Sequence, residues 1–140
     1  MSDFPVTIYH NPDCGTSRNA LAMIEAAGYA PEVIEYRRAG WTAEQLEQLC
    51  AAMGVRPRAL LREKGTPAAE LGLVDEDVSD AAMIAAMVAH PILVNRPIVV
   101  TPKGVKLCRP SEQVLELLER APAQFQKEDG EIILPFPGGQ

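Results

Sequence analysis

Cys14 is the residue with the clearest potential for chemistry in this chain of 140 residues. It lies in residues 10–19 (HNPDCGTSRN), between an apolar run that favours a β-strand and a pattern that favours a helix. The thiol is therefore expected in a strand-to-helix turn, beside the first free backbone N–H groups of a helix. Those groups and the helix dipole favour an anion, so they favour thiolate over thiol. We interpret Cys14 as a reactive thiol.

Three neighbours affect this thiol in different ways. A protonated His10 would stabilise a nearby thiolate, although the residue could equally serve only to shape the loop. Ser17 could cap the helix or form a hydrogen bond to the Cys14 sulfur. The carboxylate of Asp13 would raise the pKa of the thiol if it lies close to it.

Ser17 also stands where the second cysteine of a CxxC redox pair would be. Without that cysteine, Cys14 cannot form a disulfide within the motif. Nothing brings Cys50 or Cys108 near, so an external thiol such as glutathione is favoured. Cys50 fits the core of a helix, and strand alternation favours a structural role for Cys108.

Three arginines border loops that could meet at one edge of a sheet. They are Arg62, Arg96, which directly precedes a strand, and Arg109, which ends a hairpin. Guanidinium groups bind tetrahedral oxyanions because their forked donors match the anion geometry. The peptide bond before Pro97 is a candidate for the cis form. Since the chain contains further arginines, charge alone does not select these three.

The predicted elements follow the order β-α-β, a helical block, β-β-α. A strand, a helix and a second strand within about 30 residues indicate a parallel βαβ unit. The pattern predicts an α/β protein with a mixed four-stranded, thioredoxin-like sheet and a helical insertion between strands 2 and 3. The expected ranges are strands at 6–10 and 31–36, a helix at 17–27, the insertion at about 42–90 with a short helix at 66–73, a hairpin at 98–108 and a helix from 111.

One domain is expected over residues 1–120, followed by an irregular tail at 121–140. The net charge of −6 argues against broad attraction to nucleic acid or anionic membrane. The N-terminus lacks the pattern of a signal peptide, and no apolar run approaches the length needed to span a bilayer. The three cysteines match no zinc motif, so we expect no metal and a cytoplasmic protein with reduced thiols.

Four motifs together resemble the glutaredoxin-dependent arsenate reductases. The resemblance runs from about residue 6 to residue 118 and implies a thioredoxin-like fold with a helical insertion. The motifs are HNPxCGTSRN from His10, RALLR from Arg58, HPILxNRPIVVTP from His90 and LCRPSE from Leu107.

This resemblance implies a substrate and a mechanism. Cys14 would attack arsenate, glutathione would attack the resulting adduct, and glutaredoxin would complete the reduction to arsenite. His10 and Ser17 match residues of the family that support the thiolate. The resemblance also implies that the enzyme binds no cofactor. The matching oxyanion-binding residues are Arg62, Arg96 and Arg109.

Two alternatives stay open. A regulator of the related Spx type would use this fold to bind RNA polymerase, but such redox sensors usually carry CxxC, whereas this chain has CxxS and keeps all three arginines. A related thiol enzyme could act on another oxyanion or on a glutathione conjugate. Asp13 and the tail after about residue 120 depart from the resemblance.

Overall fold

The computed structural model describes residues 4–122 and 124–133. Contacts group the chain into two compact units. The single domain over residues 1–120 stays a prediction. One unit joins the residues up to Glu35 to those from Arg96 onward, and the other is Tyr36–Asn95. The second unit contains the predicted helical insertion and begins earlier, directly after the second strand.

The first unit contains the expected mixed sheet of four strands, in the order β2-β1-β3-β4. β1 pairs in parallel with β2, as the βαβ pattern predicts, and β3 is antiparallel to both β1 and β4. The edges of the sheet are thus β2 and β4. The strands are β1 (Thr7–His10), β2 (Glu32–Glu35), β3 (Ile98–Thr101) and β4 (Gly104–Leu107).

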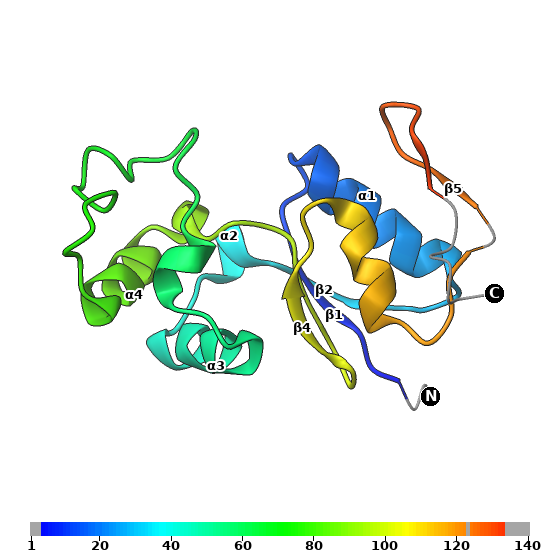
Figure 1. Cartoon of the computed structure of the whole chain (residues 1–140), viewed down its shortest axis with the longest axis horizontal. Helices are drawn as coiled ribbons and strands as arrows, with labels where there is room; N and C mark the ends of the chain where they lie inside the picture. Colours follow the sequence, from blue (N-terminus) through cyan, green and yellow to red (C-terminus); the bar gives the residue numbers. More distant parts are fainter. Residues whose placement is uncertain (1–3, 123, 134–140) are drawn as a thin grey trace. The chain divides into compact units, whose positions relative to one another are not determined.

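Two helical segments pack side by side against this sheet, α1 (Gly15–Ala26) and the 3₁₀-helix η3 (Ser111–Leu117) (Figure 1). The sequence predicts that the first helix starts at Ser17, but it starts two residues earlier. Cys14 is consequently the N-cap residue. Alternation buries Ile8 of β1 beneath α1 and η3, together with the apolar stripe of α1: Ala20, Met23 and Ile24.

The helical unit has α2 (Tyr36–Ala39), α3 (Ala43–Met53), η1 (Pro57–Leu60), α4 (Asp80–Ala89) and η2 (Pro91–Leu93). Thr42 forms the expected capping box at the start of α3. The short helix expected at 66–73 is replaced by turns. The Thr66 hydroxyl donates to backbone carbonyls before it, and Gly72 has a positive φ of 72°, so a single turn forms and ends there.

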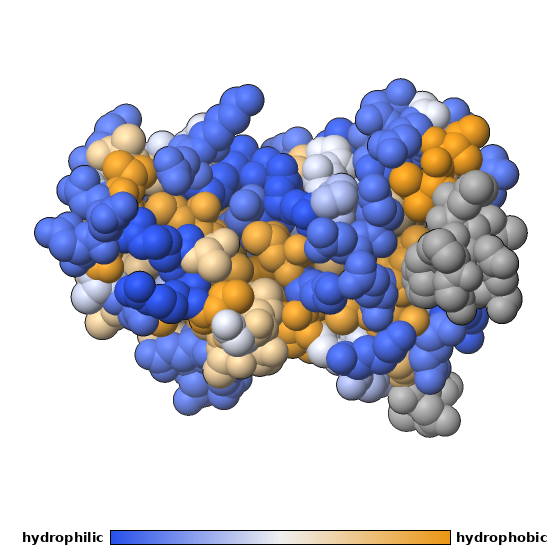
Figure 2. All heavy atoms as spheres, in the orientation of Figure 1, coloured by the Kyte–Doolittle hydropathy of each residue, from blue (hydrophilic) through white to orange (hydrophobic). Residues whose placement is uncertain are grey.

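The tail differs from the irregular segment that the sequence predicts. β5 (Phe125–Gln126) and β6 (Ile132–Ile133) form a short antiparallel hairpin. Phe125 and Ile133 pack against the core of the first unit, while Ile132 is exposed. Figure 2 shows hydrophobic surface in the region of this hairpin. The rest of the predicted tail, from residue 134, lies outside the described residues.

No helix in the described ranges, 4–122 and 124–133, combines the length and apolar character needed to cross a membrane.

Candidate active site

Cys14 lies at the junction of the loop after β1 and the first turn of α1. Its backbone N–H donates to the carbonyl of Asn11, and its carbonyl accepts the first helical hydrogen bond, from the N–H of Arg18, at 2.9 Å. The backbone at Cys14 is extended, with φ −108° and ψ 121°. The N-cap position directs the side chain toward the unpaired N–H groups of the helix.

Those N–H groups and two arginines determine the pKa of the thiol. Burial by itself would raise the pKa of Cys14. The backbone N–H of Ser17 and the positive charge of Arg96 oppose this effect, with further contributions from Arg109 and from the N–H of Thr16. The net result is a pKa below the usual value for a cysteine thiol, as expected for a nucleophile at a helix N-terminus.

The two arginines come from the loops before β3 and after β4. Nη1 of Arg109 lies 3.9 Å from Sγ of Cys14 and donates to the backbone carbonyl of Arg96 at 3.0 Å. The chain therefore holds one guanidinium group against the sulfur and brings a second cation into its field. The Arg96–Pro97 peptide bond is cis, as predicted, and so is Arg109–Pro110.

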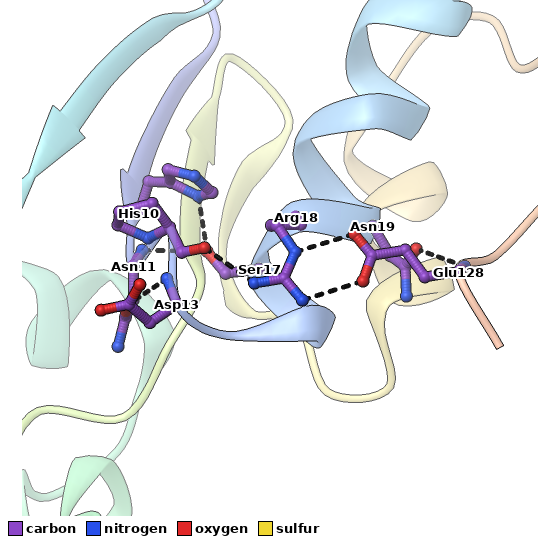
Figure 3. Close-up of polar contacts among 8 residues, drawn as sticks. His10, Asn11, Asp13, Ser17, Arg18, Asn19 and Glu128 are labelled. Carbon is purple, nitrogen blue, oxygen red and sulfur yellow. Dashed lines mark hydrogen bonds and ion pairs between the residues drawn. The ribbon is translucent and has the colours of Figure 1, made fainter.

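His10 and Ser17 form a buried pair within the segment that leads from β1 into α1 (Figure 3). Nδ1 of His10 lies 2.6 Å from Oγ of Ser17, and the same oxygen accepts the backbone N–H of Asn11 at 3.0 Å. Burial lowers the pKa of His10, against the opposing charge of Glu35. A neutral imidazole is therefore favoured near neutral pH. We propose that His10 supports the site through its contact with the Ser17 hydroxyl.

Ser17 takes part in the turn through both its hydroxyl and its backbone N–H, while Cys14 occupies the N-cap position. Its hydroxyl joins His10 to the loop, while its backbone N–H supports the sulfur of Cys14. Both contacts fix the turn between β1 and α1. Ser17 is fully buried, so this arrangement is built into the fold.

Asn11 is a site residue that the sequence analysis did not single out. It is almost completely buried, and its side-chain oxygen accepts the backbone N–H of Asp13 at 2.9 Å. This contact is an Asx-turn, which the Asn-Pro-Asp sequence could have suggested. Asp13 itself is exposed, so water screens its negative charge. This screening reduces the unfavourable effect on the Cys14 thiolate that the sequence analysis expected from Asp13.

Arg18 is a further cation beside the nucleophile. It follows Cys14 by one helical turn, and its guanidinium group donates to the carbonyl of Pro12 and to both carboxylate oxygens of Glu128 (Figure 3). Arg18 belongs to the HNPxCGTSRN motif, but its partner is 110 residues away in the chain. No local pattern could have identified that pair.

Arg62, the third predicted oxyanion-binding residue, belongs to the helical unit. Its backbone N–H donates to the carbonyl of Leu93, and its carbonyl accepts the hydroxyl of Thr66. These bonds fix the backbone at Arg62 within that unit. Its participation in oxyanion binding stays a prediction from the resemblance.

The other two cysteines are buried and have environments unlike that of Cys14. Cys108 is completely buried in the core of the first unit, and burial raises its pKa to about 12. Cys50 lies in α3 of the helical unit, where burial raises its pKa as well. Neither environment favours a thiolate.

The different environments lead to a prediction about alkylation by iodoacetamide. For Cys14, the pH at which the rate reaches half its maximum should lie below the usual thiol value of about 8.5. The reason is that the thiolate is complete above the lowered pKa and is lost as the pH falls through it. In guanidinium chloride, which unfolds the protein and removes these contacts, the pH midpoint for alkylation of Cys14 should rise. The rates are measured by mass spectrometry of the labelled peptide, and Cys108 serves as the unreactive internal control. A native midpoint at or above 8.5 would contradict the assigned contacts.

A single reactive cysteine at a strand-to-helix turn, on a mixed four-stranded sheet covered by helical segments, defines a thiol protein of the thioredoxin-like class. Residues 9–117 match the model of the ArsC family. This chain belongs to the ArsC family.

Curated relatives match over nearly the whole chain. The chain is 59% identical to arsenate reductase ArsI1 of Synechocystis sp., over 100% of this chain and 98% of the relative. It is 52% identical to the arsenate reductase of Escherichia coli strain K12, over 95% of each. Among solved structures, arsenate reductase from Vibrio cholerae aligns with a TM-score of 0.79 at 44% identity, covering 84% of this chain and 100% of that one. The predicted family and the thioredoxin-like fold are confirmed.

Proposed function

We propose that this protein reduces arsenate to arsenite, with Cys14 as the nucleophile and with glutathione and glutaredoxin supplying the electrons. The observation that carries the proposal is the contact of the Arg109 guanidinium with the Cys14 sulfur, in the field of Arg96. Two cations beside a thiolate provide a place for a tetrahedral oxyanion within reach of the nucleophile. Relatives that match nearly the full length of this chain carry the name arsenate reductase.

In the first step, the arginines neutralise the oxygens of arsenate, which lowers the repulsion between two anions. The Cys14 thiolate attacks arsenic, a sulfur–arsenic bond forms, and one oxygen leaves, protonated to water. Arsenic remains As(V) in this adduct. Glutathione then forms a second sulfur–arsenic bond and displaces another oxygen as water.

Reduction follows when a glutaredoxin thiolate attacks the sulfur of the bound glutathione. A disulfide forms between glutaredoxin and glutathione, and the electron pair of the broken sulfur–arsenic bond stays on arsenic. As(V) thereby becomes As(III). Water then cleaves the bond between arsenic and Cys14, releasing arsenite and regenerating the thiol, while a second glutathione reduces glutaredoxin.

The buried state of Cys108 supports an external source for this second thiol. A thiol with a pKa of about 12 is almost entirely protonated at neutral pH, so it is a poor attacking group. With Ser17 in place of a second motif cysteine, glutathione remains the favoured resolving thiol.

The test is a coupled assay of the purified protein with arsenate, glutathione and glutaredoxin. NADPH and glutathione reductase recycle the glutathione, and arsenite is quantified by chromatography with elemental mass spectrometry. We expect arsenite to form in proportion to the NADPH consumed, and to require all three components. Phosphate in place of arsenate should give no NADPH oxidation, because sulfur does not reduce phosphorus in this way. Equal turnover without glutaredoxin, or NADPH oxidation without arsenite, would contradict the proposal.

A further inference from the structure

The hairpin of β5 and β6 brings a carboxylate to the start of α1, next to the nucleophile. Nε and Nη2 of Arg18 donate to the two carboxylate oxygens of Glu128, at 2.8 and 2.9 Å. Gly15 is the residue after Cys14. A Cβ atom at this position would lie 3.7 Å from both Nη2 of Arg18 and Oε1 of Glu128. The absence of a side chain at Gly15 leaves this position open beside the thiol.

The bond pattern is the one by which arginine recognises a free carboxylate. Two parallel N–H donors meet two oxygens, an arrangement that is strong and specific in direction. Nη1 of Arg18 donates separately to the carbonyl of Pro12 at 2.8 Å, in the loop that leads to Cys14. This third bond holds the guanidinium group in place whether or not Glu128 occupies the other donors.

Glu128 can leave Arg18 without release of the hairpin. The ion pair is about half exposed, with side-chain exposures of 44% for Arg18 and 49% for Glu128, so it contributes little net stability. Separate contacts hold the hairpin to the first unit: Phe125 and Ile133 pack on the core, and Lys127, whose side chain is 9% exposed, pairs with Glu112 at 2.6 Å. The carboxylate of Glu128 is thus exchangeable.

We propose that Arg18 binds a carboxylate of glutathione, and that Glu128 occupies this position until glutathione displaces it. This inference rests on the proposed function and names a residue for its second substrate. Glutathione carries two carboxylates and a central thiol, and that thiol must reach the arsenic bound to Cys14. A carboxylate anchored one helical turn from the nucleophile places the tripeptide beside the adduct. The Glu128 carboxylate marks where that group binds.

The alternative is that the ion pair only braces the hairpin. The two explanations predict different directions of change for substitutions at Arg18 and Glu128. If the pair is a brace, loss of either partner removes the same contact and changes activity in the same direction. If glutathione competes with Glu128, loss of Arg18 weakens glutathione binding and loss of the Glu128 charge strengthens it.

The test compares Arg18→Gln and Glu128→Gln in the coupled assay at saturating arsenate and glutaredoxin. We expect Arg18→Gln to raise the KM for glutathione about tenfold, as loss of a charged hydrogen-bond pair should. Glu128→Gln should lower it about threefold, since it removes only an exposed competitor. The KM for arsenate should stay nearly unchanged in both. Arg56→Gln is the matched control, because Arg56 is an exposed arginine paired with Asp80 in the helical unit.

Binding of S-methylglutathione, measured by calorimetry without arsenate, separates this inference from the proposed function. Its dissociation constant should rise in Arg18→Gln and fall in Glu128→Gln even if no arsenite forms. Arg18→Lys, which keeps the charge but not the fork, should give an intermediate value. Shifts in the same direction for Arg18→Gln and Glu128→Gln, or no shift in either, would show that the ion pair is only a brace.

Discussion

Cys14→Ser is expected to abolish arsenite formation, with a loss of activity of at least about 10⁴-fold. A serine hydroxyl stays protonated in the conditions that ionise Cys14, because the N–H groups and arginines around it shift a pKa by far less than the difference between the two groups. The proposed oxyanion contacts from Arg96 and Arg109 do not depend on the sulfur. The loss of activity in Cys14→Ser should therefore be a decrease in kcat. The measurement is arsenite release in the coupled assay.

Cys50→Ser serves as the matched control for this substitution. Cys50 is also a buried cysteine, but it lies in α3 of the helical unit and its pKa is raised rather than lowered. Its variant should keep the activity of the natural sequence wherever it remains folded, as checked by circular dichroism. Arsenite formation by Cys14→Ser at more than a few per cent of the normal rate would remove Cys14 from the mechanism.

The position of Cys14 could be predicted because the signals for it are local. An apolar run, turn residues and a helical pattern follow one another within about 20 residues, and each restricts the backbone without help from distant segments. The same holds for the capping box at Thr42 and for the parallel pairing of β1 and β2. Local signals also mislead, since the apolar spacing after Ser111 suits an α-helix and the chain forms the 3₁₀-helix η3 there.

The charge state of His10 could not be predicted because it depends on burial. The sequence places His10 near the thiol and leaves open whether it is a cation or a hydrogen-bonding residue. In the fold, His10 is 7% exposed, and this burial disfavours the protonated form. Its contact with Ser17 then becomes its main effect on the turn. Hence burial, which the sequence does not reveal residue by residue, determines whether His10 is charged or neutral.

The hairpin after residue 123 could not be predicted for a related reason. Its strands have two residues each, too short for an alternating pattern to be recognised. Its contacts also join distant parts of the chain, such as Glu128 with Arg18 and Lys127 with Glu112. Charged residues in a polar tail look like a solvated segment until the partner of each is known.

Arg96→Ala is expected to raise the KM for arsenate by about 10- to 100-fold, as loss of a charged donor pair to an oxyanion should. It should also raise the pKa of Cys14, because the positive charge of Arg96 helps to lower it. The reactive thiolate would then require a higher pH, and the midpoint of alkylation by iodoacetamide would move up. Both effects are measured on one variant, by steady-state kinetics and by the pH dependence of alkylation.

Arg96→Lys separates the charge of this side chain from its geometry. Lysine restores a positive charge near the sulfur, so the pKa of Cys14 should return most of the way to its natural value. A lysine ammonium cannot donate two parallel hydrogen bonds to an oxyanion, so the KM for arsenate should stay raised. Arg56→Ala, which removes an exposed arginine of the helical unit, should alter neither quantity. If Arg96→Ala left the KM for arsenate unchanged, Arg96 would act on the thiol alone, and Arg109 would be left as the oxyanion ligand contacting Cys14.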